Sequence, residues 1–450
     1  MLKMKWSILA CAAVLALAAA SCVPATTVPA TATIVPSPIP ATVTVVPPTV
    51  APSQTPVPSP SAEPATATAE PASPTQPPLV ALAPGQPITI TTIHMLDANT
   101  GWALGGSESI GDRLLRTADG GQTWTEVSPP QPAPTTDQGL QVSPAVNFVD
   151  ADNAWITYGS GLVAPTDTSV VWHTSDGGQN WTASQPISIS LEGMAGFFAP
   201  SDLHFLDAQN GWFIAHLGAG MNHDYFTIFQ TTDSGQTWTP LLDPTQAGPQ
   251  SCSKTGLHFT SAQTGWLTGD CHGVAPGVFF MRTDDGGATW QDVALPAPAG
   301  QADLFTRDDA GCATDPLIFF GAQVAKLSVS CLILSGNPIQ TLNFVYTTQD
   351  AGANWTSAPS PARSLTFLNP VVGWALPGGD GAGQPPFDLS FTQDTGKSWT
   401  KLNTLAWTGP LDFVDTTTGW AVARADQSIA LVKTTDSGKT WQQLHPTIAP

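Results

Sequence analysis

From residue 84 to residue 450, short apolar segments alternate with clusters of Gly, Asp, Asn, Ser and Thr. Within the segments, apolar and polar positions alternate with a period of two, which is typical of β-strands that bury one face. A segment that ends in Gly-Trp, such as residues 94–102, recurs about twenty residues before a second kind of turn. Each repeating unit therefore contains four short strand-like segments, which predicts one small antiparallel sheet per unit.

The second kind of turn is an eight-residue motif: Thr, then Asp two residues later, Gly two residues after the Asp, and Trp three residues after the Gly. It occurs seven times between Thr117 and Trp441 with the same spacing. We interpret it as a hairpin turn in which the Asp accepts hydrogen bonds from turn amides, the Gly supplies a positive φ and the Trp buries its ring. This structural role, with no part in catalysis, is assigned to Asp119, Asp176, Asp233, Asp285, Asp350, Asp394 and Asp436.

A unit that is copied seven times at the scale of a domain indicates a closed array of like sheets. We therefore predict an all-β fold over residues 84–450, a single seven-bladed β-propeller of four-stranded antiparallel blades. Of the 16 Trp residues, all but Trp6, Trp172 and Trp407 lie at repeat positions, where we expect them to pack between blades. The last unit is complete at Leu444, so closure needs no exchanged strand, although residues 79–82 are a candidate for one.

The seven turns resemble the Asp boxes of the bacterial neuraminidase repeat (BNR) superfamily. Their pairing with Gly-Trp strands resembles the photosystem II assembly and stability factor propellers. The resemblance covers residues 84–450 and implies that the Asp boxes join the third and fourth strands of each blade, on the face away from the usual binding site. Asp boxes occur in sialidases, xyloglucanases, sortilin-like receptors and non-catalytic assembly factors alike, so the resemblance specifies the fold more than the function.

Residues 1–22 have the pattern of an export signal, in which a basic start precedes an apolar run and small residues precede Cys22. A Cys at this point resembles a bacterial lipobox, but Ala19 stands where Leu is commoner, so lipidation of Cys22 and plain cleavage both remain open. Residues 23–83 consist largely of Pro, Thr, Ala, Val and Ser, which predicts a disordered, extended linker. We expect an extracytoplasmic protein, either lipid-anchored at the cell membrane or secreted.

Four cysteines lie outside the signal region, and the two candidate pairs have equal separations in successive units. This spacing predicts the disulfides Cys252–Cys271 and Cys312–Cys331. No pair has the two-to-four-residue spacing of zinc ligands, so we predict no metal site and no cofactor. The formal net charge of -20, without a basic stripe, excludes nucleic acid as a partner.

In a four-stranded blade, the loops between the second and third strands share a face with the connections between blades. These loops vary here, and variable loops on a rigid scaffold commonly carry binding. The alternative for each loop residue is a solvated surface position. The candidate binding face comprises Tyr158, Asn222, His223, Asp224, Tyr225, His272 and Phe387.

The first strands of the units present polar residues at one register position. His94, His204 and His258 at this position are candidates for lining a central channel, with ordinary strand-edge hydrogen bonding as the alternative. Their spread over three blades argues against coordination of one metal ion by all three.

Known catalytic arrangements are missing from the sequence. A sialidase-like site needs three converging arginines and a Tyr activated by a Glu, whereas this chain has scattered arginines and only 3 Tyr. A xyloglucanase-type site uses carboxylates between two propellers, and only one propeller fits here. We therefore expect no enzymatic activity.

The main functional prediction is a non-catalytic, membrane-tethered scaffold that binds a protein partner or a membrane protein complex. The resemblance to photosystem II factors implies a chaperone-like role in assembly, but those propellers use an arginine-rich patch that this acidic chain lacks. The alternative is a cell-surface glycan-binding protein or a divergent sialidase-like glycoside hydrolase, with a glycan as the partner.

Overall fold

The structure is a computed structural model, and the residues it describes lie within the compact unit Ser73–Pro450. They form strands and turns and contain no helix, so the all-β prediction is confirmed. The predicted signal, Cys22 and nearly all of the predicted linker lie outside the described residues. The described ranges are 82–107, 113–130, 143–163, 167–189, 196–220, 223–245, 249, 251–271, 277–335, 338–378, 384–426 and 428–450.

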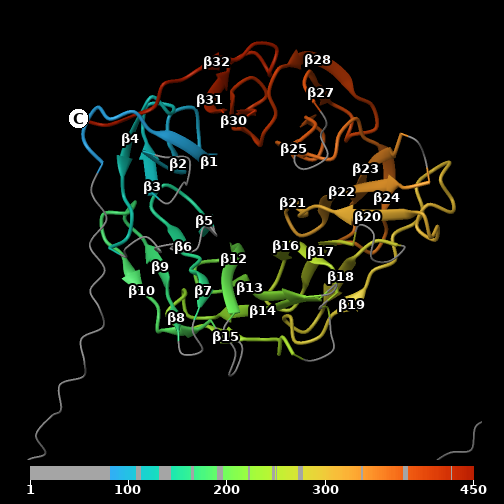
Figure 1. Cartoon of the computed structure of the whole chain (residues 1–450), viewed down its shortest axis with the longest axis horizontal. Coiled ribbons are helices and arrows are strands. Elements are labelled where there is room, and N and C mark those ends of the chain that lie inside the picture. The colour runs from blue at the N-terminus through green and yellow to red at the C-terminus, as the bar shows by residue number, and fades with distance from the viewer. Residues whose placement is uncertain are drawn as a thin grey trace, which may run out of the picture. The chain divides into compact units, whose positions relative to one another are not determined.

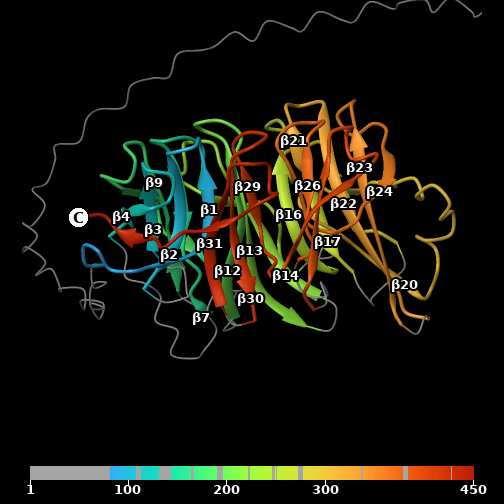
Figure 2. The same cartoon turned by 90° about the horizontal axis from the view of Figure 1, so that it is seen from above.

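The strands gather into sheets that follow one another around a ring (Figure 1), and they run across the thickness of that ring (Figure 2). In the N-terminal half, strands pair in the orders β1-β2-β3-β4-β33, β10-β9-β6-β5, β11-β8 and β15-β14-β13-β12-β7. Their bounds are β1 (Thr89–Met95), β2 (Gly101–Gly106), β3 (Arg113–Thr117), β4 (Thr123–Glu126), β5 (Ala145–Phe148), β6 (Ala154–Thr157), β7 (Gly161–Val163), β8 (Thr168–Ser169), β9 (Val171–Thr174), β10 (Thr182–Ala183), β11 (Ile187–Ser188), β12 (Gly196–Phe205), β13 (Gly211–Gly220), β14 (His223–Thr231), β15 (Thr239–Pro240) and β33 (Thr447–Ile448).

In the C-terminal half, one larger sheet joins two repeating units, because Asp270 of β17 pairs with Ala313 of β20. Two further sheets have the orders β25-β26-β27-β28 and β29-β30-β31-β32. The bounds are β16 (Ser253–Phe259), β17 (Gly265–Asp270), β18 (Phe280–Thr283), β19 (Gln291–Asp292), β20 (Ala310–Thr314), β21 (Ile318–Phe320), β22 (Val324–Ile333), β23 (Gln340–Thr348), β24 (Thr356–Pro359), β25 (Leu365–Phe367), β26 (Gly373–Ala375), β27 (Phe387–Thr392), β28 (Thr400–Leu405), β29 (Leu411–Phe413), β30 (Gly419–Ala425), β31 (Ser428–Thr434) and β32 (Gln442–Gln443).

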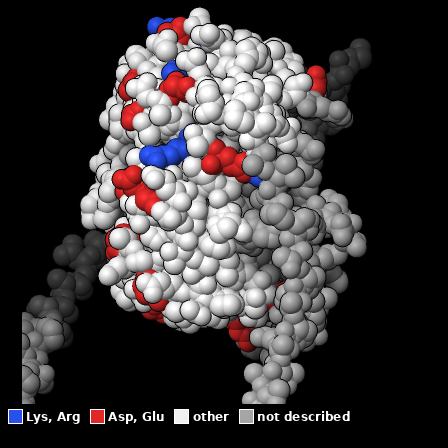
Figure 3. Space-filling model, turned by 90° about the vertical axis from the view of Figure 1, so that its left-hand side faces the viewer, with Lys and Arg blue, Asp and Glu red and all other residues white. Residues whose placement is uncertain are grey.

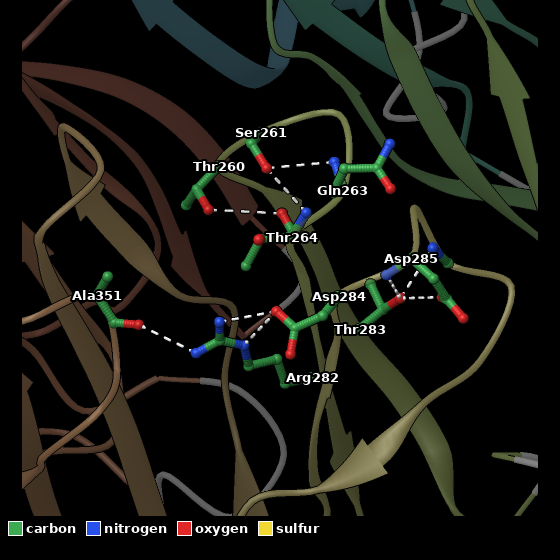
Figure 4. Close-up of polar contacts among 10 residues, drawn as sticks. Thr260, Ser261, Gln263, Thr264, Arg282, Thr283, Asp284, Asp285 and Ala351 are labelled. Atoms are coloured by element: carbon green, nitrogen blue, oxygen red, sulfur yellow. Dashed lines mark hydrogen bonds and ion pairs between the residues drawn. The ribbon is translucent and has the colours of Figure 1, made fainter. Parts of the chain in front are cut away.

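Each Asp motif joins two neighbouring antiparallel strands, as between β18 and β19 (Figure 4). The Thr283 hydroxyl donates to Asp285 Oδ1 at 2.8 Å, and the Thr289 amide donates to the same oxygen at 2.9 Å. The φ of Gly287 is 101°, and its carbonyl accepts the indole N–H of Trp290 at 3.1 Å. The Thr-to-Asp and amide-to-Asp bonds recur in all seven motifs. The aspartates are therefore occupied by their own turns.

Tryptophans of the second strands pack between sheets. Trp155 of β6 stacks on Phe205 of β12 with ring centroids 3.9 Å apart, and Trp212 of β13 stacks on Phe259 of β16 at 4.0 Å. Trp212 and Phe259 are fully buried. Truncating a buried Trp or Phe to Ala typically costs about 3–5 kcal/mol, so these contacts between successive sheets hold the ring together.

The ring closes between the first and the last sheet. The indole of Trp420 in β30 donates to the carbonyl oxygen of Gly120 at 2.9 Å. The C-terminal strand β33 pairs in parallel with β4, with Thr447 opposite Thr123 and Ile448 opposite Trp124. Closure therefore uses a strand after Leu444, which the sequence pattern does not predict because β33 is only two residues long.

Both predicted disulfides, Cys252–Cys271 and Cys312–Cys331, are present. Cys312 and Cys331 occupy paired positions on β20 and β22, and both are fully buried. Structural disulfides form and persist in oxidising compartments, which indicates an extracellular environment for this protein. No helix that is long and apolar enough to cross a membrane occurs among the described residues.

Candidate functional site

The predicted binding-face residues that the structure describes do not all lie at an exposed surface. Tyr158 and Phe387 are buried, so their rings pack within the protein core. Asn222 and His272 lie outside the described residues. His223 begins β14, where only its backbone is described, and Asp224 and Tyr225 follow it.

The predicted channel histidines separate into two places. His204 and His258 lie on the neighbouring strands β12 and β16 with ring centroids 4.2 Å apart, and His204 Nε2 lies 3.2 Å from the carbonyl oxygen of Phe259. Burial and the neighbouring His204 lower the pKa of His258 to about 3, so its ring is neutral at pH 7. His94 lies near Phe148, which belongs to the second sheet. Among the described residues, no group of three or more His, Cys, Asp or Glu could hold a metal ion.

A different set of polar side chains meets on β12, β13 and β14. His216 Nδ1 lies 3.0 Å from Asp224 Oδ1, and His216 Nε2 lies 3.2 Å from the Ser201 hydroxyl. Asp202, next to Ser201, shares a hydrogen bond with it and lies close enough to His216 for the two side chains to interact electrostatically. We call Ser201, Asp202, His216 and Asp224 the Asp-His cluster. Its His216 and Asp224 lie toward the β13–β14 connection, at the end of these strands away from the Asp box.

Asp202 has an unusual backbone and an unusual pKa. Its φ is 52°, in the left-handed region that non-Gly residues rarely adopt, and the register of β12 and β13 shifts between Ser201 and His204. Burial raises the pKa of its carboxyl, although hydrogen bonding with Ser201 and the Leu257 amide opposes the rise. A carboxylic acid with a raised pKa beside an imidazole is a common feature of functional sites.

Lys254 of β16 supports the cluster from the neighbouring sheet. Its backbone amide donates to Asp224 Oδ2 at 3.3 Å, and its ammonium lies 3.9 Å from the same oxygen. The Lys254 ammonium also donates to the carbonyl oxygens of Ser251 and Cys252 at 2.9 and 2.7 Å. Burial of this side chain, which is 0 % exposed, lowers the pKa of Lys254 to about 8.

Sequence reasoning placed Asp224 and Tyr225 on a candidate face but missed Ser201, Asp202, His216 and Lys254. Strand alternation does not predict this cluster, because Ser201 and Asp202 are adjacent and would point to opposite faces of a regular strand. The irregular register of β12 brings both toward His216. Such an irregularity leaves no signal in the spacing of polar residues.

No family model matches the sequence, and no curated protein matches it. Among solved structures, the fold is similar to a GH74 xyloglucanase from Xanthomonas campestris, with 16% identity and a TM-score of 0.50 over 82% of this chain and 56% of that chain. Another match is an α-L-arabinanase from Penicillium chrysogenum, with 10% identity and a TM-score of 0.40 over 66% of this chain and 94% of that chain. A PL25 ulvan lyase matches with 13% identity and a TM-score of 0.44 over 83% of this chain and 97% of that chain. This chain thus spans little more than half of the xyloglucanase.

At such low identity the similarity shows the fold alone, which is consistent with a BNR-like β-propeller. Two predictions are corrected by this comparison: that the protein is a non-catalytic scaffold, and that it is not an enzyme. One solved structure that shares this fold, at a TM-score of 0.50, is a GH74 xyloglucanase, which is an enzyme. The sequence argument failed because it tested only the sialidase and xyloglucanase arrangements, whereas one fold can host many different sites. Neither a protein partner nor the photosystem II resemblance gains support from these structures.

Proposed function

We propose that this protein is an extracytoplasmic, carbohydrate-active propeller of seven blades. It binds a glycan on the face opposite the Asp boxes and acts on it by acid–base chemistry at the Asp-His cluster. The observation that carries the proposal is the geometry of this cluster, in which His216 lies 3.0 Å from Asp224 and 3.2 Å from the Ser201 hydroxyl, with the Asp202 carboxyl, whose pKa burial raises, next to Ser201. Burial-raised carboxyl groups serve as proton donors in enzymes that act on sugars.

The surroundings of the cluster suit a sugar chain. Tyr225 follows Asp224 on β14, and its half-buried ring packs against a hydrophobic core cluster. Ala219 and Gly220, at the end of β13, are exposed and carry no bulky side chain. Aromatic rings with a few well-placed polar groups are typical of sites for small ligands.

The charge of the molecule favours a neutral glycan. Asp and Glu number 34 against 14 Lys and Arg, and the side of the molecule in Figure 3 shows acidic groups scattered over a largely uncharged surface. An acidic surface repels uronic acid and sulfate groups. A neutral polysaccharide such as xyloglucan, which the name of the GH74 xyloglucanase points to, is therefore the first substrate to test.

The test combines a glycan array with digestion of neutral polysaccharides, followed by mass spectrometry of the products. We expect wild-type protein to bind and modify a neutral glycan. Asp202→Asn should lose product formation and retain binding. Asp388→Asn serves as a matched control for the chemical step, because Asp388 is an exposed carboxylate on β27 that pairs with Lys401 at 2.7 Å and is not part of the Asp-His cluster. Folded wild-type protein that neither binds nor modifies any glycan would refute the proposal.

The division of the whole chain belongs to the same proposal. Residues 1–22 direct export, residues 23–83 form an extended linker, and residues 84–450 form the propeller. Cys22 carries a lipid that holds the protein at the cell membrane. The two disulfides support export. Cys22→Ser should move the protein from the membrane fraction to the soluble fraction, and an unchanged distribution would argue for simple secretion.

A further inference from the structure

We infer that Ser201, His216 and Asp224 form a nucleophile relay that hydrolyses acyl esters, such as O-acetyl groups carried by a glycan. The glycan part rests on the proposed function, whereas the ester chemistry rests on the geometry of the relay itself. Nothing in the Asp box motifs or in the propeller fold requires this arrangement.

The two nitrogens of His216 have the partners that a hydrolytic relay needs. Nδ1 lies 3.0 and 3.1 Å from the two oxygens of Asp224, so a carboxylate holds the proton on that nitrogen. The Nε2 lone pair then faces the Ser201 hydroxyl at 3.2 Å and can take its proton. A nucleophile, a base and a group that orients the base are the three roles that such catalysis requires.

Asp224 is held in place as an orienting group should be. It is buried, accepts the backbone amide of Lys254 at 3.3 Å and lies 3.9 Å from the Lys254 ammonium. The disulfide Cys252–Cys271 lies next to this lysine in the chain and fixes the start of β16. These contacts limit the positions that Asp224 can adopt, and so the orientation of the His216 ring.

Access and backbone geometry fit a reactive serine. Ser201 is half-buried and 18% of the His216 side chain is exposed, so neither residue is enclosed in the core. The positive φ of Asp202 places an unusual backbone conformation directly after Ser201. Strained backbone that the surrounding structure maintains is concentrated at functional sites.

The reaction balances without a cofactor. Ser201 Oγ forms a bond to the acyl carbon and gives its proton to His216 Nε2, and the ester C–O bond breaks as that proton passes to the departing sugar hydroxyl. Water then attacks the acyl-serine, gives a proton to Nε2 and releases the carboxylic acid, while the proton returns to Ser201.

The first test is a fluorophosphonate probe, which reacts covalently with activated serines, followed by peptide mapping of the full-length protein. We expect one label per molecule, on Ser201. Ser201→Ala should abolish labelling, and His216→Asn should reduce it strongly while keeping an amide that can bond Asp224. Ser360→Ala is the matched control, because the Ser360 hydroxyl donates to the Ala362 carbonyl at 2.8 Å, outside the cluster. Near-ultraviolet circular dichroism establishes that each variant is folded.

The second test measures hydrolysis of p-nitrophenyl acetate and release of acetate from an acetylated neutral polysaccharide. Loss of Ser201 or His216 should lower the rate by about 1000-fold or to background. Absence of label on folded wild-type protein, or equal activity of Ser201→Ala, would overturn the relay. Glycan binding without a reactive Ser201 would leave the proposed function standing and remove the ester chemistry. A reactive Ser201 without any glycan binding would support the ester chemistry and remove the proposed function.

Discussion

Aspartate has two opposite roles in this molecule, and the difference lies in the surroundings of each side chain. In the Asp boxes, hydrogen bonds from neighbouring hydroxyl and amide groups hold the pKa low, and at Asp285 and Asp394 it is lowered to about 2. At Asp202, burial dominates and raises the pKa. The Asp boxes could be predicted because their partners lie within four residues in the sequence. The role of Asp202 could not be predicted, because its partners His216 and Leu257 come from other strands.

The raised pKa of Asp202 predicts a pH-dependent cost to stability. The folded protein binds this proton more tightly than the unfolded chain, so stability falls as pH rises from about 3.8 through the raised pKa and stays lower above it. Asp202→Asn removes the cost of burying a carboxylate. We expect its melting temperature to exceed that of wild type at pH 8 and to differ little near pH 4. Asp388→Asn should show no such gain, and an equal loss at both pH values for Asp202→Asn would contradict the prediction.

At the scale of elements, local patterns were predictable and contacts between distant elements were not. Equal cysteine spacing in successive units correctly predicted both disulfides. The Asp box correctly predicted the hairpin between strands such as β18 and β19. The joining of two units through Asp270 and Ala313 has no sequence signal, because a single backbone pairing places no demand on side-chain type.

The Cys312–Cys331 disulfide should contribute substantially to the stability of its sheet. It ties β20 to β22 across a sequence separation of 19 residues. Closing a loop of this size stabilises the folded state by about 3 kcal/mol in the chain-entropy model. The double variant Cys312→Ala, Cys331→Ala should lose about that much in urea unfolding, plus a smaller term for the two buried sulfurs. A double variant as stable as wild type would show that the bridge constrains the unfolded chain very little.

At the scale of the whole molecule, repetition predicted the fold, whereas absence of known catalytic motifs misled the functional prediction. Seven copies of one motif indicate an array of like sheets, so the all-β architecture of several sheets follows from the repeat. A site such as the Asp-His cluster needs four side chains from three strands and lies outside the repeated motif. Repetition carries no information about such a feature, and the irregular register of β12 hides it further.

The many hydrogen-bonded aspartates predict cooperative loss of stability in acid. The pKa values of Asp285, Asp394 and Asp415 are each lowered to about 2, chiefly by side-chain hydrogen bonds from a Thr or Ser. The stability they provide is fully present above their ordinary pKa near 3.8 and is lost as pH falls toward 2. The melting temperature should therefore fall steeply between pH 4 and 2. Replacing these three residues by Asn should flatten that fall, and an unchanged slope would assign acid unfolding to other groups.

Closure of the ring depends on the last strand. Ile448 is buried, its amide donates to Gln86 O at 2.9 Å, and its carbonyl accepts the amide of Gly85 at the same distance. Ile448→Ala keeps these backbone bonds and removes the side chain that fills the space between the first and the last sheet, so it should lower the free energy of unfolding by about 2–4 kcal/mol. His445→Ala, at an exposed position three residues earlier, should change it by less than about 0.5 kcal/mol. If urea unfolding gave equal small changes for both variants, the ring would be held closed by the Trp420–Gly120 contact and its neighbours without help from β33.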